Sequence, residues 1–97
     1  MSILVLLQIT AQPDKVAALT EAFGRLLPDT RAHDGCESVT VHVDQDDPAR
    51  LVLLERWASR DHYERYFAWR IERGDLDAVG ALTAGPPSIS YLDDTDH

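Results

Sequence analysis

The residues best suited to chemistry in this sequence are concentrated in one stretch, Glu55–Arg70. It contains both tryptophans, two of the three tyrosines, a phenylalanine, a histidine and four arginines, although aromatic residues make up only 7% of the chain. Tryptophan rings can stack on a flat substrate, a tyrosine hydroxyl can exchange a proton, and a guanidinium can stabilise an oxyanion. The stretch is therefore either the aromatic filling of a small core or the lining of a pocket for a flat substrate.

Helical spacing in the second part of this stretch separates packing residues from candidate catalytic residues. Successive helical residues turn by about 100°, so one stripe contains Tyr63, Phe67, Arg70 and Ile71. We expect Phe67 and Ile71 to pack in the core. Tyr66 and Arg70 are one turn apart, and we predict that Tyr66 hydrogen-bonds or transfers a proton while Arg70 stabilises an oxyanion. Alternatively, both side chains extend along the surface to reach water.

The first part of the stretch belongs to a predicted strand, Arg50–Trp57, in which side chains alternate between two faces. Glu55 and Trp57 therefore share a face with Leu51 and Leu53. If that face meets the helices, Glu55 is a carboxylate in an apolar layer. Such a group either pairs with an arginine or has its pKa raised by desolvation. We predict that Trp57 stacks on the substrate and positions it, and that Glu55 binds the substrate as a weaker candidate for the base.

Four further side chains complete the predicted substrate site. Tyr63 lies on the same helical stripe as Arg70, and Trp69 is expected to be a lid or an interface residue. His42 is a second weak candidate for the base. Gln8 lines the pocket if its strand face turns towards the helices.

The standard nucleotide-binding, metal and nucleophile motifs are absent from the sequence. The four histidines are scattered and have no second ligand at metal spacing, so we predict no metal site. His62, in the first turn of its helix, is expected to be exposed. His33-Asp34-x-Cys36 resembles a set of metal ligands but falls in a turn, and Cys36 is expected to act as a small apolar residue entering a strand.

Hydrophobic patterns around these residues predict four strands, because short apolar or alternating runs are bounded by turn residues. The expected strands are Ile3–Thr10, Glu37–Asp44, Arg50–Trp57 and Ser88–Asp93.

Two helices connect these strands, and a segment with a weaker helical signal follows the second helix. The first helix opens at Pro13-Asp14 and should end or kink at Pro28. The second is capped by Ser59 and stops at Gly74. A weaker helical segment is expected at Asp75–Leu82. The order β-α-β-β-α-β is typical of a ferredoxin-like α+β fold, with a four-stranded antiparallel sheet and both helices on one face.

The other face of such a sheet would be bare, yet the strands are apolar on both faces. In the first strand, Leu4 and Leu6 lie on the opposite face from Ile3, Val5 and Leu7. In the third strand, Val52 and Leu54 lie on the opposite face from Leu51 and Leu53. An apolar sheet face of this size is normally an interface. We therefore predict a homodimer that packs sheet against sheet.

Length and composition limit the remaining possibilities. The 97 residues fit one domain, residues 1–97, with an acidic tail at about 93–97. A net charge of −8 disfavours nucleic acid as a partner. No apolar run reaches the ~20 residues that span a membrane, and the N-terminus does not match a signal peptide. The single cysteine fits a reducing cytoplasm, which is the expected location.

The stretch from Asp34 to Tyr66 resembles the antibiotic biosynthesis monooxygenase-like family of dimeric α+β barrel proteins. The resemblance is carried by Gly35-Cys36, Asp47-Pro48 and Glu55-x-Trp57, in this order and spacing. Members often have a histidine on the second helix, nine residues after that tryptophan, where this chain has Tyr66. The first strand also lacks the asparagine of the haem-degrading branch, which disfavours haem degradation. The branch that acts on aromatic polyketides is more similar, because its members resemble this chain in having tryptophan, tyrosine and arginine about the pocket.

What the resemblance implies is a cofactor-independent monooxygenase that uses O2 to oxidise an electron-rich polycyclic anthrone or phenol to a quinone. A deprotonated phenol or enol can donate an electron directly to O2, so no cofactor is expected. The protein would supply a dry pocket, a proton acceptor and oxyanion stabilisation. Two alternatives remain open: a cyclase or isomerase of the same fold, and a non-catalytic dimeric protein that binds a small molecule.

Overall fold

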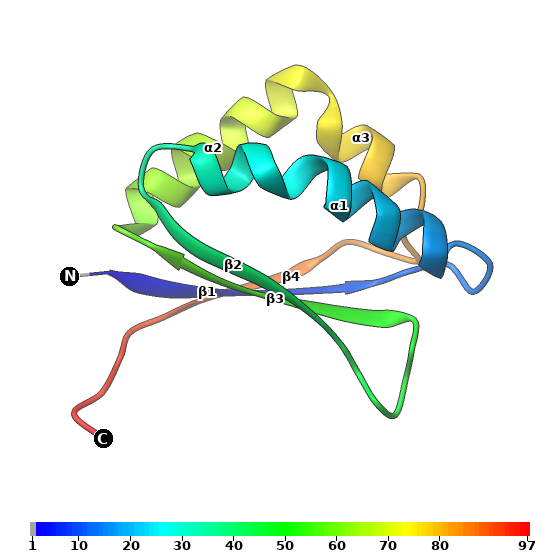
Figure 1. Cartoon of the computed structure of the whole chain (residues 1–97), viewed down its shortest axis with the longest axis horizontal. Coiled ribbons are helices and arrows are strands. Elements are labelled where there is room, and N and C mark those ends of the chain that lie inside the picture. The colour runs from blue at the N-terminus through cyan, green and yellow to red at the C-terminus, as the bar shows by residue number, and fades with distance from the viewer. Residues whose placement is uncertain (1) are drawn as a thin grey trace.

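The computed structural model describes residues 2–97, which form one sheet covered on one face by helices (Figure 1). The elements follow the order β1 (Ile3–Thr10), α1 (Val16–Ala32), β2 (Cys36–Val43), β3 (Arg50–Trp57), α2 (Arg60–Arg73), α3 (Asp75–Gly80) and β4 (Ser88–Leu92). The strand order is β2-β3-β1-β4, and every neighbouring pair is antiparallel. This architecture confirms the predicted ferredoxin-like fold.

The odd-numbered residues of β1 and β3 face the helices. Val5 pairs with Glu55 and Ile9 pairs with Leu51, and all four side chains are buried. Because side chains alternate along a strand, the neighbouring even-numbered residues point to the opposite, open face. The register therefore decides which polar residues can reach the space between the sheet and the helices.

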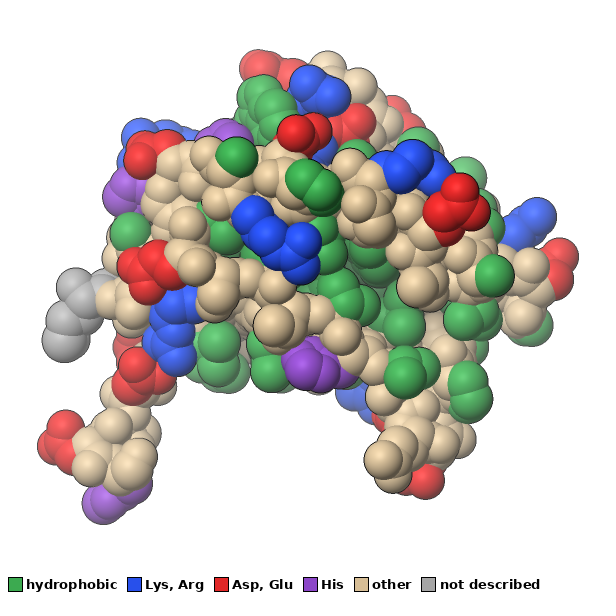
Figure 2. Space-filling view, in the orientation of Figure 1, with side chains coloured by type: hydrophobic (Ala, Val, Ile, Leu, Met, Phe, Trp, Pro, Cys, Tyr) green, Lys and Arg blue, Asp and Glu red, His purple; other side chains and the backbone are tan. Residues whose placement is uncertain are grey.

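The apolar residues between the sheet and the helices form two clusters. The larger one joins β1, β2 and β3 to α1 and α3, and contains Ile9, Leu19, Phe23, Leu27, Leu51, Leu53 and Val79. The smaller one is built around Val5, Trp57 and Tyr63. In the space-filling view, hydrophobic side chains are visible between α1 and the edge strand β2, so the core is not fully closed on this side (Figure 2).

Pro28 does not end α1, which continues to Ala32. Of the two outcomes predicted for Pro28, an end or a kink of the helix, the first is wrong. Proline removes one amide donor and leaves the carbonyl four residues earlier, that of Gly24, without its helical partner. Pro28 and Gly24 are both exposed, so water can satisfy that carbonyl. The extra turn carries Thr30, which is buried against α2.

The two ends of α2 follow the predicted capping signals. The Ser59 side chain accepts a hydrogen bond from the His62 amide at 3.2 Å. At the other end, Gly74 adopts the left-handed conformation with φ of 78°, and its amide donates to the carbonyls of Arg70 and Ile71. These caps fix the residues at which α2 begins and ends.

Ile71 is not a core residue, contrary to the prediction. Its side chain is 57% exposed, whereas Tyr63 and Arg70 are buried. The face of α2 towards the sheet is centred on Tyr63, Tyr66 and Arg70. Ile71 lies roughly 90° away from that direction, so it projects from the side of the helix.

The open face of the sheet has no covering element among residues 2–97. Leu4, Leu6, Val52 and Leu54 lie there and are each half-buried by their neighbours. The β2–β3 hairpin and the C-terminal residues extend beyond this face at its two ends (Figure 1). Within residues 2–97, no helix is both long and apolar enough to cross a membrane.

Candidate functional site

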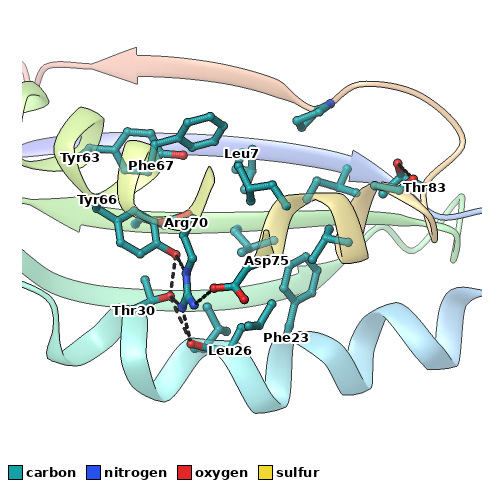
Figure 3. A pocket seen from close by; sticks show the side chains of 18 residues that line it. Leu7, Phe23, Leu26, Thr30, Tyr63, Tyr66, Phe67, Arg70, Asp75 and Thr83 are labelled. Atoms are coloured by element: carbon teal, nitrogen blue, oxygen red, sulfur yellow. Dashed lines mark hydrogen bonds and ion pairs between the residues drawn. The ribbon is translucent and has the colours of Figure 1, made fainter. Parts of the chain in front are cut away.

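A cavity of about 190 Å³ lies between the helices and the helix-facing side of the sheet. Its walls are mainly apolar and come from β1, β3, α1 and α3, with Leu7, Ile9, Phe23, Leu53, Leu76 and Val79 among them. Figure 3 shows Tyr63, Tyr66, Phe67 and Arg70 lining it from α2. The polar or charged side chains of its wall are Thr30, Glu55, Tyr63, Tyr66, Arg70, Asp75 and Thr83.

Arg70 is the centre of a hydrogen-bond network that joins α2 to α1 and α3 (Figure 3). Its side chain is only 2% exposed. Nη1 donates to Asp75 Oδ2 at 2.8 Å, and Nη2 donates to the Leu26 carbonyl at 2.7 Å and to Thr30 Oγ1 at 2.9 Å. Nε donates to the Tyr66 hydroxyl at 3.0 Å. Arg70 therefore does not extend along the surface to water.

Tyr66 completes this network. Its hydroxyl lies 2.7 Å from Thr30 Oγ1, in addition to accepting the bond from Arg70. Burial raises the pKa of Tyr66, although its hydrogen bonds with Thr30 and Arg70 oppose that effect. A hydroxyl with this pKa and two protein partners is a poor proton acceptor at neutral pH. The contacts fix Tyr66 and Arg70 relative to α1.

The ionic partner of Arg70 is on α3. Asp75 also accepts from Arg73 Nε at 3.0 Å, so one carboxylate binds two arginines. The hydrogen bond from Arg70 is the main reason that the pKa of Asp75 lies below its ordinary value. This pairing holds the start of α3 against α2 at one end of the cavity.

Glu55 is the carboxylate in this site without an ionic partner among residues 2–97. It is 3% exposed, and its hydrogen bond comes from Trp57 Nε1, which lies 3.0 Å from Oε1. Burial raises the pKa of Glu55, and the bond from Trp57 only partly opposes this rise. Of the two possibilities predicted for Glu55, desolvation applies and pairing with an arginine does not, since no arginine among residues 2–97 forms an ion pair with it.

Trp57 lies behind the cavity wall. It is 0% exposed and is not among the residues that line the cavity. Its ring packs edge-on against Tyr63, with 5.5 Å between centroids, and lies 5.0 Å from the Tyr66 ring. The structure thus brings Trp57 to the site through Glu55 and Tyr63. It offers no open indole face for stacking on a bound molecule.

The other predicted substrate residues are divided between the two sides of the sheet. Tyr63 lines the cavity, and burial raises its pKa. Gln8 on β1 and His42 on β2 both pair with Val52 of the strand between them, β3, and lie with it on the open face. Neither side chain therefore reaches the cavity. Trp69 is also outside the cavity wall, with the Arg70 and Arg73 guanidinium carbons 4.8 and 4.9 Å from its ring centroid.

Two side chains that hydrogen-bond to Arg70, those of Thr30 and Asp75, were not predicted. Thr30 lies beyond Pro28, where the helix was expected to end, so its contact with Arg70 was hidden by that expectation. Asp75 follows the stop at Gly74, and a carboxylate there in a first helical turn is commonly exposed. A signal for Asp75 was its position five residues after an arginine on the inner face of α2.

The arrangement suits proton transfer in a dry environment. A buried carboxylate with a raised pKa can accept a proton near neutral pH, and an apolar cavity strengthens electrostatic effects inside it. Within residues 2–97 no group of three or more His, Cys, Asp or Glu side chains is arranged to hold a metal ion. Cys36 is half-buried beside Glu55, and burial raises the pKa of its thiol to about 11, which makes it a poor nucleophile.

Comparisons with known proteins agree with this fold over its whole length. The family model for antibiotic biosynthesis monooxygenase matches residues 2–69. The Mycobacterium tuberculosis protein Rv0793 is 30% identical over 97 aligned residues, which cover 91% of this chain and 86% of that protein. Its solved structure has a TM-score of 0.86 at 27% identity and covers 100% of this chain and 98% of that one.

Two further solved structures have similar scores. One from Caulobacter crescentus CB15 has a TM-score of 0.86 at 26% identity, covering 98% of this chain and 91% of the other. A conserved protein from Methanosarcina mazei Go1 has a TM-score of 0.88 at 17% identity, covering 98% and 94%, and shares the fold. The chain therefore belongs to the antibiotic biosynthesis monooxygenase family.

Proposed function

We propose that this protein is a cofactor-independent monooxygenase that oxidises an electron-rich phenol- or anthrone-type aromatic to a quinone with O2. Glu55 is the proton acceptor in this proposal. The observation that carries it is the buried Glu55 carboxylate, which lines an apolar cavity and lacks an ionic partner among residues 2–97. Membership of the family supports the reaction type.

The chemistry needs no external reductant. Glu55 removes a proton from the hydroxyl or the acidic carbon of the substrate, and the resulting anion donates an electron to O2. One oxygen atom then forms the new carbonyl, and the other leaves as water with two hydrogens of the substrate. For 1-naphthol the balance is C10H8O + O2 → C10H6O2 + H2O. The substrate itself supplies both electrons that reduce the second oxygen atom.

Arg70 is the proposed oxyanion stabiliser. A guanidinium has five N–H donors. Four of the five donate hydrogen bonds within the protein, to Tyr66, Asp75, Leu26 and Thr30. One N–H remains for an oxygen of the substrate in the cavity. Tyr66 supports this role by holding the Nε side of the guanidinium, and Tyr63 contributes an aromatic wall.

The size of the cavity favours small ring systems. An apolar cavity of about 150 Å³ is large enough to bind benzene, and the cavity of this protein measures about 190 Å³. A one- or two-ring phenol is compatible with that volume. A three-ring anthrone would require the segment around α3, which supplies Leu76, Val79 and Gly80 to the wall, to move outwards.

The proposal includes a homodimer that packs through the open sheet face. Leu4, Leu6, Val52 and Leu54 lie together on this face, where Leu6 pairs with Leu54, and the polar Gln8 and Arg56 flank them. A chain of this length leaves much apolar surface uncovered by itself. A second copy with the same face would bury it.

A non-redox reaction is the second candidate. A carboxyl group with a raised pKa can both remove and return a proton, which suits an isomerase or a cyclase. A non-catalytic binding protein would use the same cavity without turnover. Oxygen consumption separates the first proposal from both: an isomerase or cyclase forms product under nitrogen, whereas a binder only shows saturable quenching of tryptophan fluorescence.

The test is oxygen uptake by the purified protein with phenol, 1-naphthol and anthrone. We expect uptake with at least one of these compounds and incorporation of one atom of 18O into its product. Glu55→Gln should lose at least 90% of the rate, in line with the ~10²-fold effect of removing a general base. Glu37→Gln, on the exposed surface of β2, is the matched control. Absence of uptake with all three compounds would contradict the proposal.

A further inference from the structure

We propose that Trp57 is a positioning residue, which orients Glu55 and favours its ionised form through the indole N–H, without touching the substrate. This inference rests on the proposed role of Glu55 as the proton acceptor. It replaces the expectation that Trp57 stacks on the substrate.

The geometry begins with the strand. Glu55 and Trp57 are two residues apart on β3, so both side chains point to the helix side of the sheet. The indole Nε1 lies 3.0 Å from Glu55 Oε1, and both residues are almost completely buried. An indole N–H can only donate. It therefore favours the carboxylate, which accepts, over the protonated acid.

The indole itself has little freedom to move. Tyr63 packs edge-on against it, Tyr66 lies 5.0 Å away and the His33 ring lies 6.3 Å away, measured between centroids. Packing from α2 and from the end of α1 therefore fixes the donor before any substrate binds. With Oε1 held in this way, Oε2 has no hydrogen bond within residues 2–97 and is the oxygen available to the cavity.

The other groups around Glu55 do not replace this donor. Cys36 on β2 and Tyr63 and Tyr66 on α2 lie near the carboxylate. Burial raises the pKa of each of these three groups, so each is neutral at pH 7 and supplies no positive charge to Glu55. Arg70 is bound to Asp75. Trp57 is thus the group that opposes the effect of burial on the pKa of Glu55.

Nuclear magnetic resonance on the ligand-free protein tests this inference directly. The carboxyl carbon of Glu55 is titrated in the wild type, in Trp57→Phe and in Trp69→Phe. The last variant makes the same substitution at the other tryptophan, which has no contact with Glu55. Loss of a charge-assisted hydrogen bond should raise the pKa of Glu55 by about one pH unit or more in Trp57→Phe. Trp69→Phe should leave it unchanged.

If Trp57→Phe does not fold, the titration of the indole proton of Trp57 in the wild type and in Glu55→Gln gives an independent measurement. The indole proton of Trp57 should shift with the same midpoint as the Glu55 carboxyl carbon, and Glu55→Gln should abolish that shift. The indole proton of Trp69 should not follow it. An indole signal of Trp57 that ignores the Glu55 titration, or equal Glu55 midpoints in both tryptophan variants, would overturn the inference.

Because these measurements need no substrate, they separate the inference from the proposed reaction. Coupled titration without oxygen uptake would reject the reaction and leave the positioning contact in place. Oxygen uptake without coupled titration would do the reverse. If both hold, the low-pH limb of the rate profile should move to higher pH in Trp57→Phe, which a purely structural loss would not produce.

Discussion

Arg70 and Asp75 form an ion pair across Gly74, with 2.8 Å between Nη1 and Oδ2; the Arg70 side chain is buried and that of Asp75 is half-buried. Gly74 is in the left-handed conformation, and this turn lets α3 fold back so that its first residue meets the guanidinium of α2. The same guanidinium reaches Leu26 and Thr30 of α1. One arginine thus connects the three helices that enclose the cavity.

Asp75→Asn should destabilise the protein. The change leaves the Arg70 charge buried without its carboxylate, and breaking a buried pair in this way costs on the order of 3 kcal/mol. Urea denaturation gives the free energy of unfolding. Asp77→Asn is the matched control, because Asp77 lies on the exposed side of the same helix. Equal stabilities of the two variants would mean that the ion pair contributes little.

The same pair predicts a loss of stability in acid. The pKa of Asp75 is lowered in the folded protein, so its contribution is present above the unfolded value of about 3.8 and is lost as pH falls through the lower folded pKa. Asp75→Asn should remove this part of the acid dependence. A denaturation series across that range, compared with Asp77→Asn, measures it.

Glu55→Gln should stabilise the protein at neutral pH. The pKa of Glu55 is raised above its ordinary value of 4.5, so the folded protein holds a proton that the unfolded chain releases. Wild-type stability therefore falls as pH rises from that value through the folded pKa. The variant lacks this dependence, and a folded pKa that lies one pH unit above the unfolded pKa corresponds to about 1.4 kcal/mol. Identical pH profiles of wild type and variant would contradict the buried, ionisable state of Glu55.

Much of the fold could be predicted from the sequence because its signals are local. The alternation in β3, the Ser59 cap and the Gly74 stop each depend on neighbouring residues, and the structure contains all three. The end of α1 was predicted wrongly because Pro28 lies on the exposed side of the helix, one turn before its end, and the helix continues past it. Ile71 was wrongly placed in the core because the predicted stripe included it, whereas the buried face is centred on Tyr63, Tyr66 and Arg70.

The site was less predictable because it depends on which face of each strand meets the helices. The register puts Glu55 and Trp57 inside and Gln8 and His42 outside. β1 and β3 are apolar on both faces, so neither strand by itself shows which face meets the helices. The partners of Arg70 come from Leu26, Thr30 and Asp75, which only the tertiary packing brings together. Tyr66 and Arg70 were correctly expected to be near one another.

Tyr66→Phe should lower turnover at least tenfold while the fold remains intact. The hydroxyl accepts from Arg70 Nε and contacts Thr30, so its loss frees one side of the guanidinium that is proposed to stabilise the oxyanion. The expected loss of stability is about 1 kcal/mol. Steady-state oxygen uptake and thermal unfolding measure the two effects. Tyr91→Phe, outside the cavity wall, is the control, and wild-type turnover in Tyr66→Phe would remove this residue from the mechanism.

Leu54→Glu should split the proposed dimer. It puts a charge in the centre of the apolar open face, where a second copy would have to bury it. Light scattering gives the molar mass of the variant and of Val43→Glu, which introduces the same charge at an exposed position on β2. We expect a monomer only for Leu54→Glu. A variant that keeps the molar mass of a wild-type dimer would reject this face as the interface.

The most direct test of the central claim is the pH dependence of oxygen uptake with 1-naphthol, from about pH 4 to about pH 9, for wild type and Glu55→Gln. Because the acceptor must be ionised, the wild-type rate should rise through a pKa above 4.5, the ordinary value for glutamate. The variant should show neither that limb nor more than a tenth of the rate. A Glu55→Gln protein with the wild-type rate and the same limb would contradict Glu55 as the proton acceptor.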